Sequence, residues 1–440
     1  MRPELHFTPI RNWMNDPNGL IYYKGEYHVF YQHFPYTCQW GTMHWGHAVS
    51  KDLVSFTHLP IALYPSKYDD RNGCFSGSAI EKDGKLYLYY TSIRYAKENP
   101  ENVHIQYSDD DLIASQSVVI SNDGYTFDNV KDKHKVIDVI NDQTLGDKRH
   151  TRDPKVWIGK NDHIYMIIGS KVKSEQGYDG EVLFYESEDG LHFQYKNRYI
   201  DSQIGDMWEC PDLFQLNHNY YFIFSPEHIN QPPQPDSSAV IMPVQFDEET
   251  CTLTHQSTYT YLDYGLDFYA PQTFLDEYGN RVVLGWFRMR EPGINEDWCG
   301  MLSYPRVLNV RDDHVYQTVH PHIQSLFNEE TKTIDYLHPF MMKASLKENE
   351  SMNLGGLKIW IHDDKLYVNR AQVSIQHEKV CQECHTPKLN HRYDLEIYYD
   401  QYIFEIYINE GYYVCSQIVY HLDYSLHDYP SHAVILKKNL

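Results

Sequence analysis

The sequence predicts an all-β protein in which a five-bladed β-propeller is followed by a C-terminal β-sandwich. Three observations lead to this fold class. Helical periodicity is nearly absent, one strand–turn–strand pattern recurs five times, and the last part of the chain alternates apolar and polar residues. The 440 residues also exceed what one ordinary hydrophobic core holds, so more than one domain is expected.

A short polar turn followed by an aromatic-rich strand is the repeating unit. It reads KGEYHVFYQ, DGKLYLYYTS, NDHIYMIIGS, HNYYFIFS and YGNRVVLGWF. The turn markers are Gly25, Gly84, Asp162, Asn219 and Gly279, which gives spacings of 59, 78, 57 and 60 residues. A similar strand precedes each turn, so each turn joins a hairpin. Units of this length hold about four strands, the size of a propeller blade, and five turns predict five blades around a central channel.

The repeat stops near Val310, and the chain changes character. Residues 356–375 and 391–420 alternate apolar and polar side chains, the pattern of half-buried antiparallel strands. This pattern predicts a β-sandwich. We place the catalytic propeller at residues 1–312 and the sandwich at residues 322–440, with the boundary between about Val310 and Ser325.

The charge balance and the cysteines limit the partners of the protein. Its formal net charge is −23, which makes nucleic acid and anionic membranes poor partners. No apolar run is long enough to span a bilayer, and the N-terminus lacks the apolar segment of a signal peptide. Eight cysteines spread thinly over the chain do not form a disulfide framework, so a cytoplasmic location is expected. The sequence leaves the oligomeric state open.

Three acids hold nearly the same place in three of the repeats. Asp16 lies 9 residues before its turn marker, Asp153 lies 9 before its marker, and Glu209 lies 10 before its marker. If these strands line the channel, the three carboxylates meet at one spot near its axis. The alternative is that Asp and Glu merely end strands there.

The local surroundings of the three acids suggest different roles. Arg152 precedes Asp153 and is expected to keep it ionised, and Asn15 supplies an amide donor beside Asp16. Glu209 lies among apolar neighbours that would favour its protonated form. A protonated acid facing a carboxylate can cleave a glycosidic bond by double displacement, with Asp16 as nucleophile and Glu209 as acid and then base. Retention requires these carboxyls about 5–5.5 Å apart, against roughly 6.5–9.5 Å for inversion.

At these residues the sequence resembles glycoside hydrolase family 32, the invertase and sucrose-6-phosphate hydrolase family. The matching segments include WMNDPNGL, GCFSGSA, RDPKVW, MWECPDLF and LDYGLDFYAPQTF, and they run almost end to end. The resemblance implies a five-bladed propeller with a C-terminal sandwich and retaining hydrolysis of terminal β-D-fructofuranosides. It assigns Asp16 as nucleophile, Asp153 as transition-state stabiliser and Glu209 as acid/base. It also implies that these residues surround the fructosyl unit: Asn15, Gln32, Trp40, Phe75, Ser76, Arg152, Tyr269 and Trp286.

Departures from the family pattern leave the substrate open among sucrose, sucrose-6-phosphate and short fructans. FSPEHI stands where FSPQG is usual, and LSYPR where LTLPR is usual. Arg288 and Arg290 lie in a segment that either reaches the leaving group or forms a solvated loop. The alternatives to hydrolysis are fructosyl transfer on the same scaffold and a non-catalytic sugar-binding propeller.

We expect no cofactor and no metal. CQECH, which contains Cys381, Cys384 and His385, matches a haem-attachment or zinc pattern, but a sandwich loop with free thiols is the preferred interpretation.

Overall fold

The computed structural model describes residues 2–175, 177–230, 235–255, 257–293, 295–375 and 381–439. Helix is confined, in this part of the chain, to the four-residue α1 (Pro321–Gln324) and the short 3-10 turn η1 (Asp109–Asp111). The expectation of an all-β chain is confirmed. No helix in the described residues is long and apolar enough to cross a membrane.

Each of the five predicted turns joins two antiparallel strands. At the first two turns, Lys24 with Gly25 and Asp83 with Gly84 all have positive φ values, between 50° and 88°. Two adjacent residues with positive φ form the tight hairpin turn that matches the twist of paired strands. Glycine adopts this conformation without steric cost, which is why the turn markers are visible in the sequence.

Five antiparallel sheets follow one another along the first 319 residues. In the first, β20 (Trp298–Cys299) precedes β1 (Asn12–Tyr23), β2 (Glu26–Phe34), β3 (His44–Ser50) and β4 (Phe56–Leu63). The second contains β5 (Gly73–Lys82), β6 (Lys85–Tyr95), β7 (Leu112–Ser121) and β8 (Lys133–Ile137). The third contains β9 (Arg152–Ile158), β10 (Ile164–Ser174), β11 (Gly177–Ser187) and β12 (Gln194–Asp201).

The fourth and fifth sheets each carry one additional short strand. The fourth contains β13 (Met207–Leu216), β14 (Asn219–Glu227), β15 (Val240–Asp247) and β16 (Thr252–Thr254), with β17 (Thr260–Tyr261) also on β15. The fifth contains β18 (Phe268–Leu275), β19 (Arg281–Phe287), β22 (Arg306–Arg311) and β23 (His314–Val319), with β21 (Met301–Leu302) also on β19.

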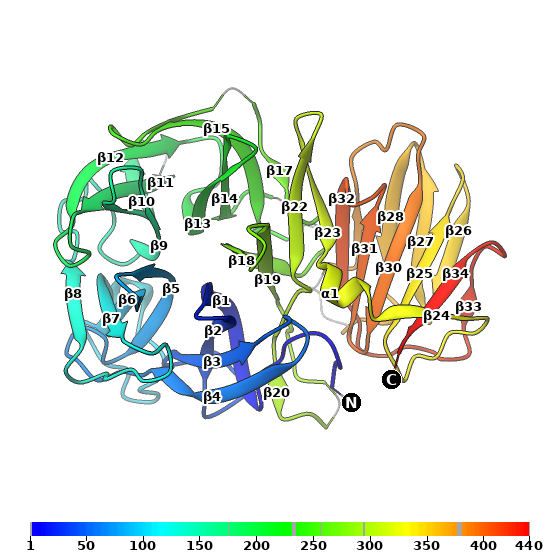
Figure 1. The fold of residues 1–440 in the computed structure, drawn as a ribbon, viewed down its shortest axis with the longest axis horizontal. Helices are drawn as coiled ribbons and strands as arrows, with labels where there is room; N and C mark the ends of the chain where they lie inside the picture. The colour runs from blue at the N-terminus through cyan, green and yellow to red at the C-terminus, as the bar shows by residue number, and fades with distance from the viewer. Residues whose placement is uncertain are drawn as a thin grey trace.

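The five sheets are arranged around a common centre, and the first strand of each lies innermost (Figure 1). These innermost strands are β1, β5, β9, β13 and β18. The ring is closed by β20, which comes late in the chain and pairs in parallel with β1 through Asn12 and Trp13. The N-terminal segment adds to this closure, because Leu302 donates its backbone N–H to the carbonyl of Phe7. The first and last sheets are thereby tied together.

Two further sheets form the C-terminal part of the chain, beside the ring (Figure 1). One contains β24 (Phe327–Thr331), β34 (Val434–Lys438), β25 (Phe340–Ser345), β30 (Asp394–Asp400), β31 (Ile403–Ile408) and β32 (Tyr413–Ile418). The other contains β29 (Glu383–His385), β28 (Lys365–Asn369), β27 (Leu357–His362), β26 (Ser351–Leu354) and β33 (His427–Asp428). Alternate residues such as Ile359, Ile397 and Ile406 form one buried cluster between them.

The C-terminal sheets are joined to the ring through buried charged side chains, here called the interface network: His6, Asp263, Arg306, Asp400 and Glu405. Arg306 donates to Glu405 at 2.7 and 3.0 Å and lies 2.9 Å from Asp263. His6 contacts Asp400 and Glu405 at 2.9 Å each. The side chains of all five are fully buried, so the two parts of the chain pack as one body at this point.

Candidate active site

The innermost strands all depart from regular pairing at the same level. Each one has a register shift relative to its neighbour: near Asp16 in β1, Ser76 in β5, Asp153 in β9, Cys210 in β13 and Ala270 in β18. In β9, β13 and β18 the residue before a proline has a positive φ: 67° at Asp153, 47° at Cys210 and 48° at Ala270. Bulges re-aim side chains, and strain of this kind concentrates at functional sites.

The prolines set the register among the repeats. Asp16 and Asp153 directly precede Pro17 and Pro154, whereas Glu209 is two residues before Pro211. Asp16 and Asp153 are therefore equivalent, and Glu209 is offset by one position, with Cys210 occupying the place of the other two acids. Successive side chains of a strand point to opposite sides. Because of the one-residue offset, the Glu209 side chain therefore leaves its strand in a different direction from the side chains of Asp16 and Asp153.

A small cavity of about 10 Å³ on the axis touches all five innermost strands. Its lining includes Pro17, Ser76, Asp153, Cys210 and Ala270, one residue from each strand. The thiol of Cys210 lies 3.8 Å from Asp16 Oδ2 and 3.6 Å from Asp153 Oδ2. The structure thus brings acids from the first and third sheets to one thiol of the fourth.

Asp16 is held by two side-chain donors. Ser76 donates its hydroxyl to Oδ2 at 2.5 Å, and Asn15 donates its amide to Oδ1 at 3.0 Å. Trp13 fixes Asn15 in turn, because its indole N–H donates to Asn15 Oδ1 at 2.8 Å. Burial raises the pKa of Asp16, the two donors oppose that shift, and the charge of Glu209 adds to it. Asp16 is therefore oriented rigidly with one carboxylate face toward the site.

Glu209 is surrounded by donors, which corrects the expectation of an apolar environment. Arg152 donates to Oε1 through Nη2 at 2.7 Å and through Nε at 3.2 Å. Tyr269 donates its hydroxyl to Oε2 at 2.6 Å. Arg152 was expected to keep Asp153 ionised, but its guanidinium bonds to Glu209 of the neighbouring sheet, because side chains of adjacent strand residues point to opposite faces.

Asp153 receives one backbone donor instead of the guanidinium. Its Oδ2 accepts the N–H of Cys210 at 3.0 Å, while its own N–H donates to Thr91 Oγ1 at 2.9 Å. Burial, opposed by the nearby charge of Arg152 and reinforced by Glu209 and Asp16, raises the pKa of Asp153 to about 7. Three carboxyl groups in one buried site cannot all be ionised without cost.

Aromatic side chains form the walls around the acids. Trp40 meets Phe75 edge to face, with ring centroids 5.6 Å apart, and Trp13 meets Trp286 in the same way at 5.8 Å. The Trp286 indole N–H is buried and has no hydrogen-bond partner among the described residues. It is therefore a free donor beside the acids. Half-buried aromatic faces with such a donor suit a sugar ring.

Gln32 and Arg288 lie behind these walls. Gln32 is 2 % exposed and donates its amide to the carbonyl of Cys74 at 3.0 Å, so in this structure it supports the strand that carries Ser76. The Arg288 guanidinium stacks on the ring of Tyr269 at 4.5 Å and donates to the carbonyl of Ser237. Arg288 thus positions Tyr269, whereas Arg290 is exposed.

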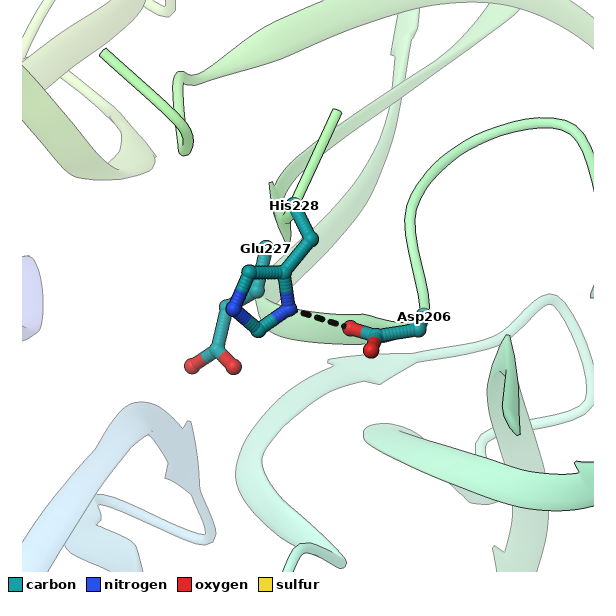
Figure 2. Close-up of side chains that lie close together, drawn as sticks. All are labelled: Asp206, Glu227 and His228. Atoms are coloured by element: carbon teal, nitrogen blue, oxygen red, sulfur yellow. Dashed lines mark hydrogen bonds and ion pairs between the residues drawn. The ribbon is translucent and has the colours of Figure 1, made fainter. Parts of the chain in front are cut away.

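Glu227 is a site residue that was not predicted from the sequence. It lies in the segment FSPEHI, which departs from the FSPQG usual in the family. Its Oε1 accepts from Arg152 at 3.4 Å, so Arg152 divides its charge between Glu227 and Glu209. Burial and the charge of Glu209 raise the pKa of Glu227 to about 7, against the effect of Arg152. Figure 2 shows Glu227 beside His228 and Asp206, whose side chains bond to each other at 2.8 Å. Ligand atoms of the three lie within 4.8 Å, but each already has a protein partner.

Cys384 and His385 of the CQECH segment lie on β29 of the C-terminal sheets. Cys384 points into the C-terminal core, where its sulfur lies 3.1 Å from that of Cys415. His385 is exposed and bonds to the carbonyl of Thr386. Along β29 the two side chains therefore face opposite sides, and His377 lies outside the described residues.

Comparison with known proteins gives a family for this geometry. Residues 6–319 match the model of the glycosyl hydrolases family 32 N-terminal domain. The chain is 32 % identical over 453 residues to a sucrose-6-phosphate hydrolase of Zymomonas mobilis subsp. mobilis, covering 93 % of this chain and 84 % of that protein. It is 31 % identical over 449 residues to a sucrose-6-phosphate hydrolase of Escherichia coli, covering 95 % and 89 %.

Solved structures agree with the family match. A family 32 β-fructofuranosidase of Bombyx mori has a TM-score of 0.79 at 27 % identity, covering 99 % of this chain and 91 % of that one. A sucrose-6-phosphate hydrolase of Lactobacillus gasseri shares the fold, with a TM-score of 0.85 at 24 % identity and coverage of 100 % and 93 %. The resemblance seen in the sequence motifs is thereby confirmed: the chain belongs to glycosyl hydrolase family 32.

Proposed function

We propose that this glycosyl hydrolase is a β-fructofuranosidase that releases the terminal β-D-fructofuranosyl unit of sucrose or sucrose-6-phosphate with retention. The relatives that cover most of its length carry the names of hydrolases of these sugars. The observation that carries the proposal is the convergence of acids from three sheets: the Cys210 thiol contacts Asp16 and Asp153, and Arg152, next to Asp153, bonds to Glu209, next to Cys210. Paired carboxyl groups with an oriented nucleophile are what glycoside cleavage requires.

In the first step, Asp16 Oδ attacks the anomeric carbon as Glu209 gives its proton to the departing glycosidic oxygen. A covalent fructosyl–enzyme ester forms, and glucose or its phosphate leaves. Glu209, now ionised, takes a proton from water, which attacks the same carbon and regenerates Asp16. Ser76 and Asn15 hold the nucleophile in line for both displacements. Asp153 accepts hydrogen bonds from ring hydroxyls, which strengthen as positive charge develops on the sugar.

Arg152 and Tyr269 prepare Glu209 for its two roles. Both donate to it in the structure, and so they hold its two carboxyl oxygens in place. Glu227 shares the Arg152 guanidinium with Glu209. The remaining residues around the site, Trp40, Phe75 and Trp286, complete a wall for the fructosyl unit, and Gln32 supports it from behind.

The proposal extends to architecture and location. The five sheets of the ring correspond to five blades of a propeller, and the two C-terminal sheets to a sandwich. The pairing of β22 with β23 favours moving the end of the catalytic domain from residue 312 to Val319. The free thiols favour a cytoplasmic location; they are Cys38, Cys74, Cys210, Cys251, Cys299, Cys384 and Cys415.

The test is a comparison of catalytic efficiency on sucrose, sucrose-6-phosphate and kestose, with proton NMR of the first-formed fructose. We expect β-fructofuranose as the first product and no cofactor requirement. Release of the α-anomer first would exclude double displacement through Asp16. Binding of sucrose without any release of glucose would favour the non-catalytic alternative, and oligosaccharides at high sucrose would favour fructosyl transfer.

A further inference from the structure

A second cavity, of about 310 Å³, lies between the loop that leads into β9 and the ends of β10 and β11. It is called here the basic cavity and is lined by Asp110, Ile140, Asn141, Gln143, Gly146, Asp147, Lys148, Arg149, Lys171, Lys173 and Tyr178. Four of these side chains are basic and two are acidic, in a chain with a net charge of −23. The cavity is therefore a positive site on an acidic protein.

The two acidic side chains of the basic cavity are both bonded to Arg149. Asp147 bonds to Arg149 at 3.1 and 3.2 Å, and Asp110 bonds to the same guanidinium. Three ammonium groups are left for a ligand. Among them Lys171 is half-buried, forms no ion pair with the described residues, and lies 4.4 Å from the centre of the Tyr178 ring. Burial lowers the pKa of Lys171, opposed by the charge of Asp147, as for a cation without a bonded counterion.

The loop that forms one wall is anchored to the sheet rather than loose. Thr151 Oγ1 lies 2.9 Å from Ser170 Oγ of β10, and Lys148 accepts the N–H of Ala114 through its carbonyl at 2.9 Å. Gly146 packs with its Cα against the same serine, since a Cβ there would lie 3.1 Å from Ser170 Oγ. The walls of the cavity therefore keep their shape before a ligand arrives.

The basic cavity adjoins the acids of the active site. His150 comes directly after Arg149, a residue that lines the cavity. It accepts a hydrogen bond from Arg152 at 2.8 Å, and Arg152 also bonds to Glu209. On the other side, a Cβ at Gly169 would lie 2.0 Å from the carbonyl of Trp208, directly before Glu209. Lys171 lies two residues further on the same face of β10. The Arg152 guanidinium thus bridges Glu209 of the active site and His150, which directly follows the lining residue Arg149.

We propose that the basic cavity is a phosphate subsite that binds the 6-phosphate of the glucosyl unit of sucrose-6-phosphate, with Lys171 as its main contact. This inference rests on the proposed function and specifies its substrate class. An ester phosphate carries up to two negative charges and binds lysine ammonium groups as point charges. Asp206 and Glu227 lie near Lys171, but their bonds to His228 and Arg152 leave the ammonium for the phosphate.

The test compares kcat/KM for sucrose-6-phosphate with kcat/KM for sucrose in the wild-type protein and in Lys171→Met. Loss of a hydrogen bond to a charged group predicts that the ratio of the two efficiencies falls by roughly 10- to 100-fold in the variant. Lys171→Arg is expected to retain most of the ratio. The matched control is Lys358→Met, which removes an exposed lysine from the C-terminal sheets and leaves the ratio as in the wild type. Glucose 6-phosphate, as product inhibitor, is expected to lose affinity only in Lys171→Met.

The outcomes separate this inference from the proposed function. A wild-type protein that hydrolyses sucrose without preferring its phosphate ester overturns the subsite and leaves the hydrolase intact. An equal loss on both substrates in Lys171→Met also overturns it, because that result means a general structural role. Failure to cleave either sugar would instead contradict the proposed function as a whole.

Discussion

The molecule contains two buried groups of acids that are built in opposite ways. In the interface network, Glu405 and Asp263 face Arg306, and Asp400 shares His6 with Glu405. In the active site, Asp16 and Asp153 face a serine hydroxyl, an amide, a thiol and a backbone N–H, while the one guanidinium goes to Glu209 and Glu227. The two groups therefore differ in how much positive charge they are given.

The consequence is visible in the direction of the pKa shifts. Burial favours the neutral form of an acid in both places. At the interface, Arg306 and His6 outweigh burial and lower the pKa of Glu405 to about 2. In the active site, burial prevails and raises the pKa of Asp153 to about 7. The difference teaches that Glu405 is kept charged at the interface, whereas Asp153 is kept poised in the active site at a cost to stability, as expected where chemistry is done.

The largest effect is expected from removing the proposed nucleophile. Asp16→Ala leaves no group to form the covalent intermediate, so turnover of sucrose is expected to fall by at least about 10⁴-fold. Because Asp16 lacks a cationic partner, the free energy of unfolding should not fall. Glucose release and urea unfolding are the measurements, and Glu209→Ala is expected to be similarly inactive. Activity near that of the wild type in either variant would contradict the assignment.

The next effect in size belongs to the interface network. Glu405→Gln leaves Arg306 and His6 buried with less counter-charge, so the free energy of unfolding is expected to fall by about 3–5 kcal/mol. The matched control is Glu410→Gln, an exposed carboxylate bonded to Arg311 and Arg392, for which little change is expected because solvent screens exposed ion pairs. Urea unfolding at pH 7 measures both. Equal losses in the two variants would mean that the interface acids are not special.

The sequence predicted what is encoded locally. The turn residues predicted the five hairpins, and the spacing of Asp16, Asp153 and Glu209 before those turns follows from the repeat. Asn15 was expected to donate to Asp16 and does so, but the local sequence around Glu209 could not give its partners, because they come from other sheets: Arg152 and Tyr269 lie 57 and 60 residues away. Adjacency in the chain pointed to a wrong partner for Arg152, since neighbouring strand residues face opposite ways.

The interface network could not be predicted from the sequence either, because its members lie far apart in the chain. His6 lies 394 residues from Asp400 and 399 from Glu405, and nothing in its local pattern differs from that of an exposed histidine. The 1–312 boundary was drawn where the repeat ended, but β22 continues into β23 by ordinary hairpin pairing up to Val319. Long-range charge pairing and the last strand of a repeat both depend on the assembled fold.

A smaller, pH-dependent effect is expected at His6. Hydrogen bonds to Asp400 and Glu405, with their charges, outweigh burial and raise its pKa. A base with a raised pKa in the folded state stabilises fully below its unfolded pKa of about 6.5, and this contribution is lost as the pH rises through the folded value. The advantage of the wild type over His6→Gln is therefore expected to be about 1.5–3 kcal/mol at pH 6 and less at pH 9.

Urea unfolding at the two pH values measures this advantage. His338→Gln, an exposed histidine beside Glu4, is the matched control and should show little dependence. A constant difference across the pH range would mean that His6 is neutral in the folded protein, and would remove one of the two cations from the interface network.

The smallest expected effect is a gain in stability, opposite in sign to the loss expected for Glu405→Gln. It therefore gives the sharpest test of the difference between the two groups of acids. Asp153→Asn keeps an oxygen to accept the Cys210 N–H but removes a carboxylate whose ionisation is disfavoured in the fold. An acid with a raised folded pKa costs stability above that pKa, and the cost disappears as the pH falls from about 7 toward the unfolded value near 4. We therefore expect the variant to be more stable than the wild type at pH 8 by about 1 kcal/mol, roughly 2 °C in Tm, with a smaller gain at pH 5 and a loss of turnover. Thermal unfolding at both pH values decides it: if Asp153→Asn destabilises at pH 8 as Glu405→Gln does, the two groups of acids are alike, and the active site is not poised at the expense of the fold.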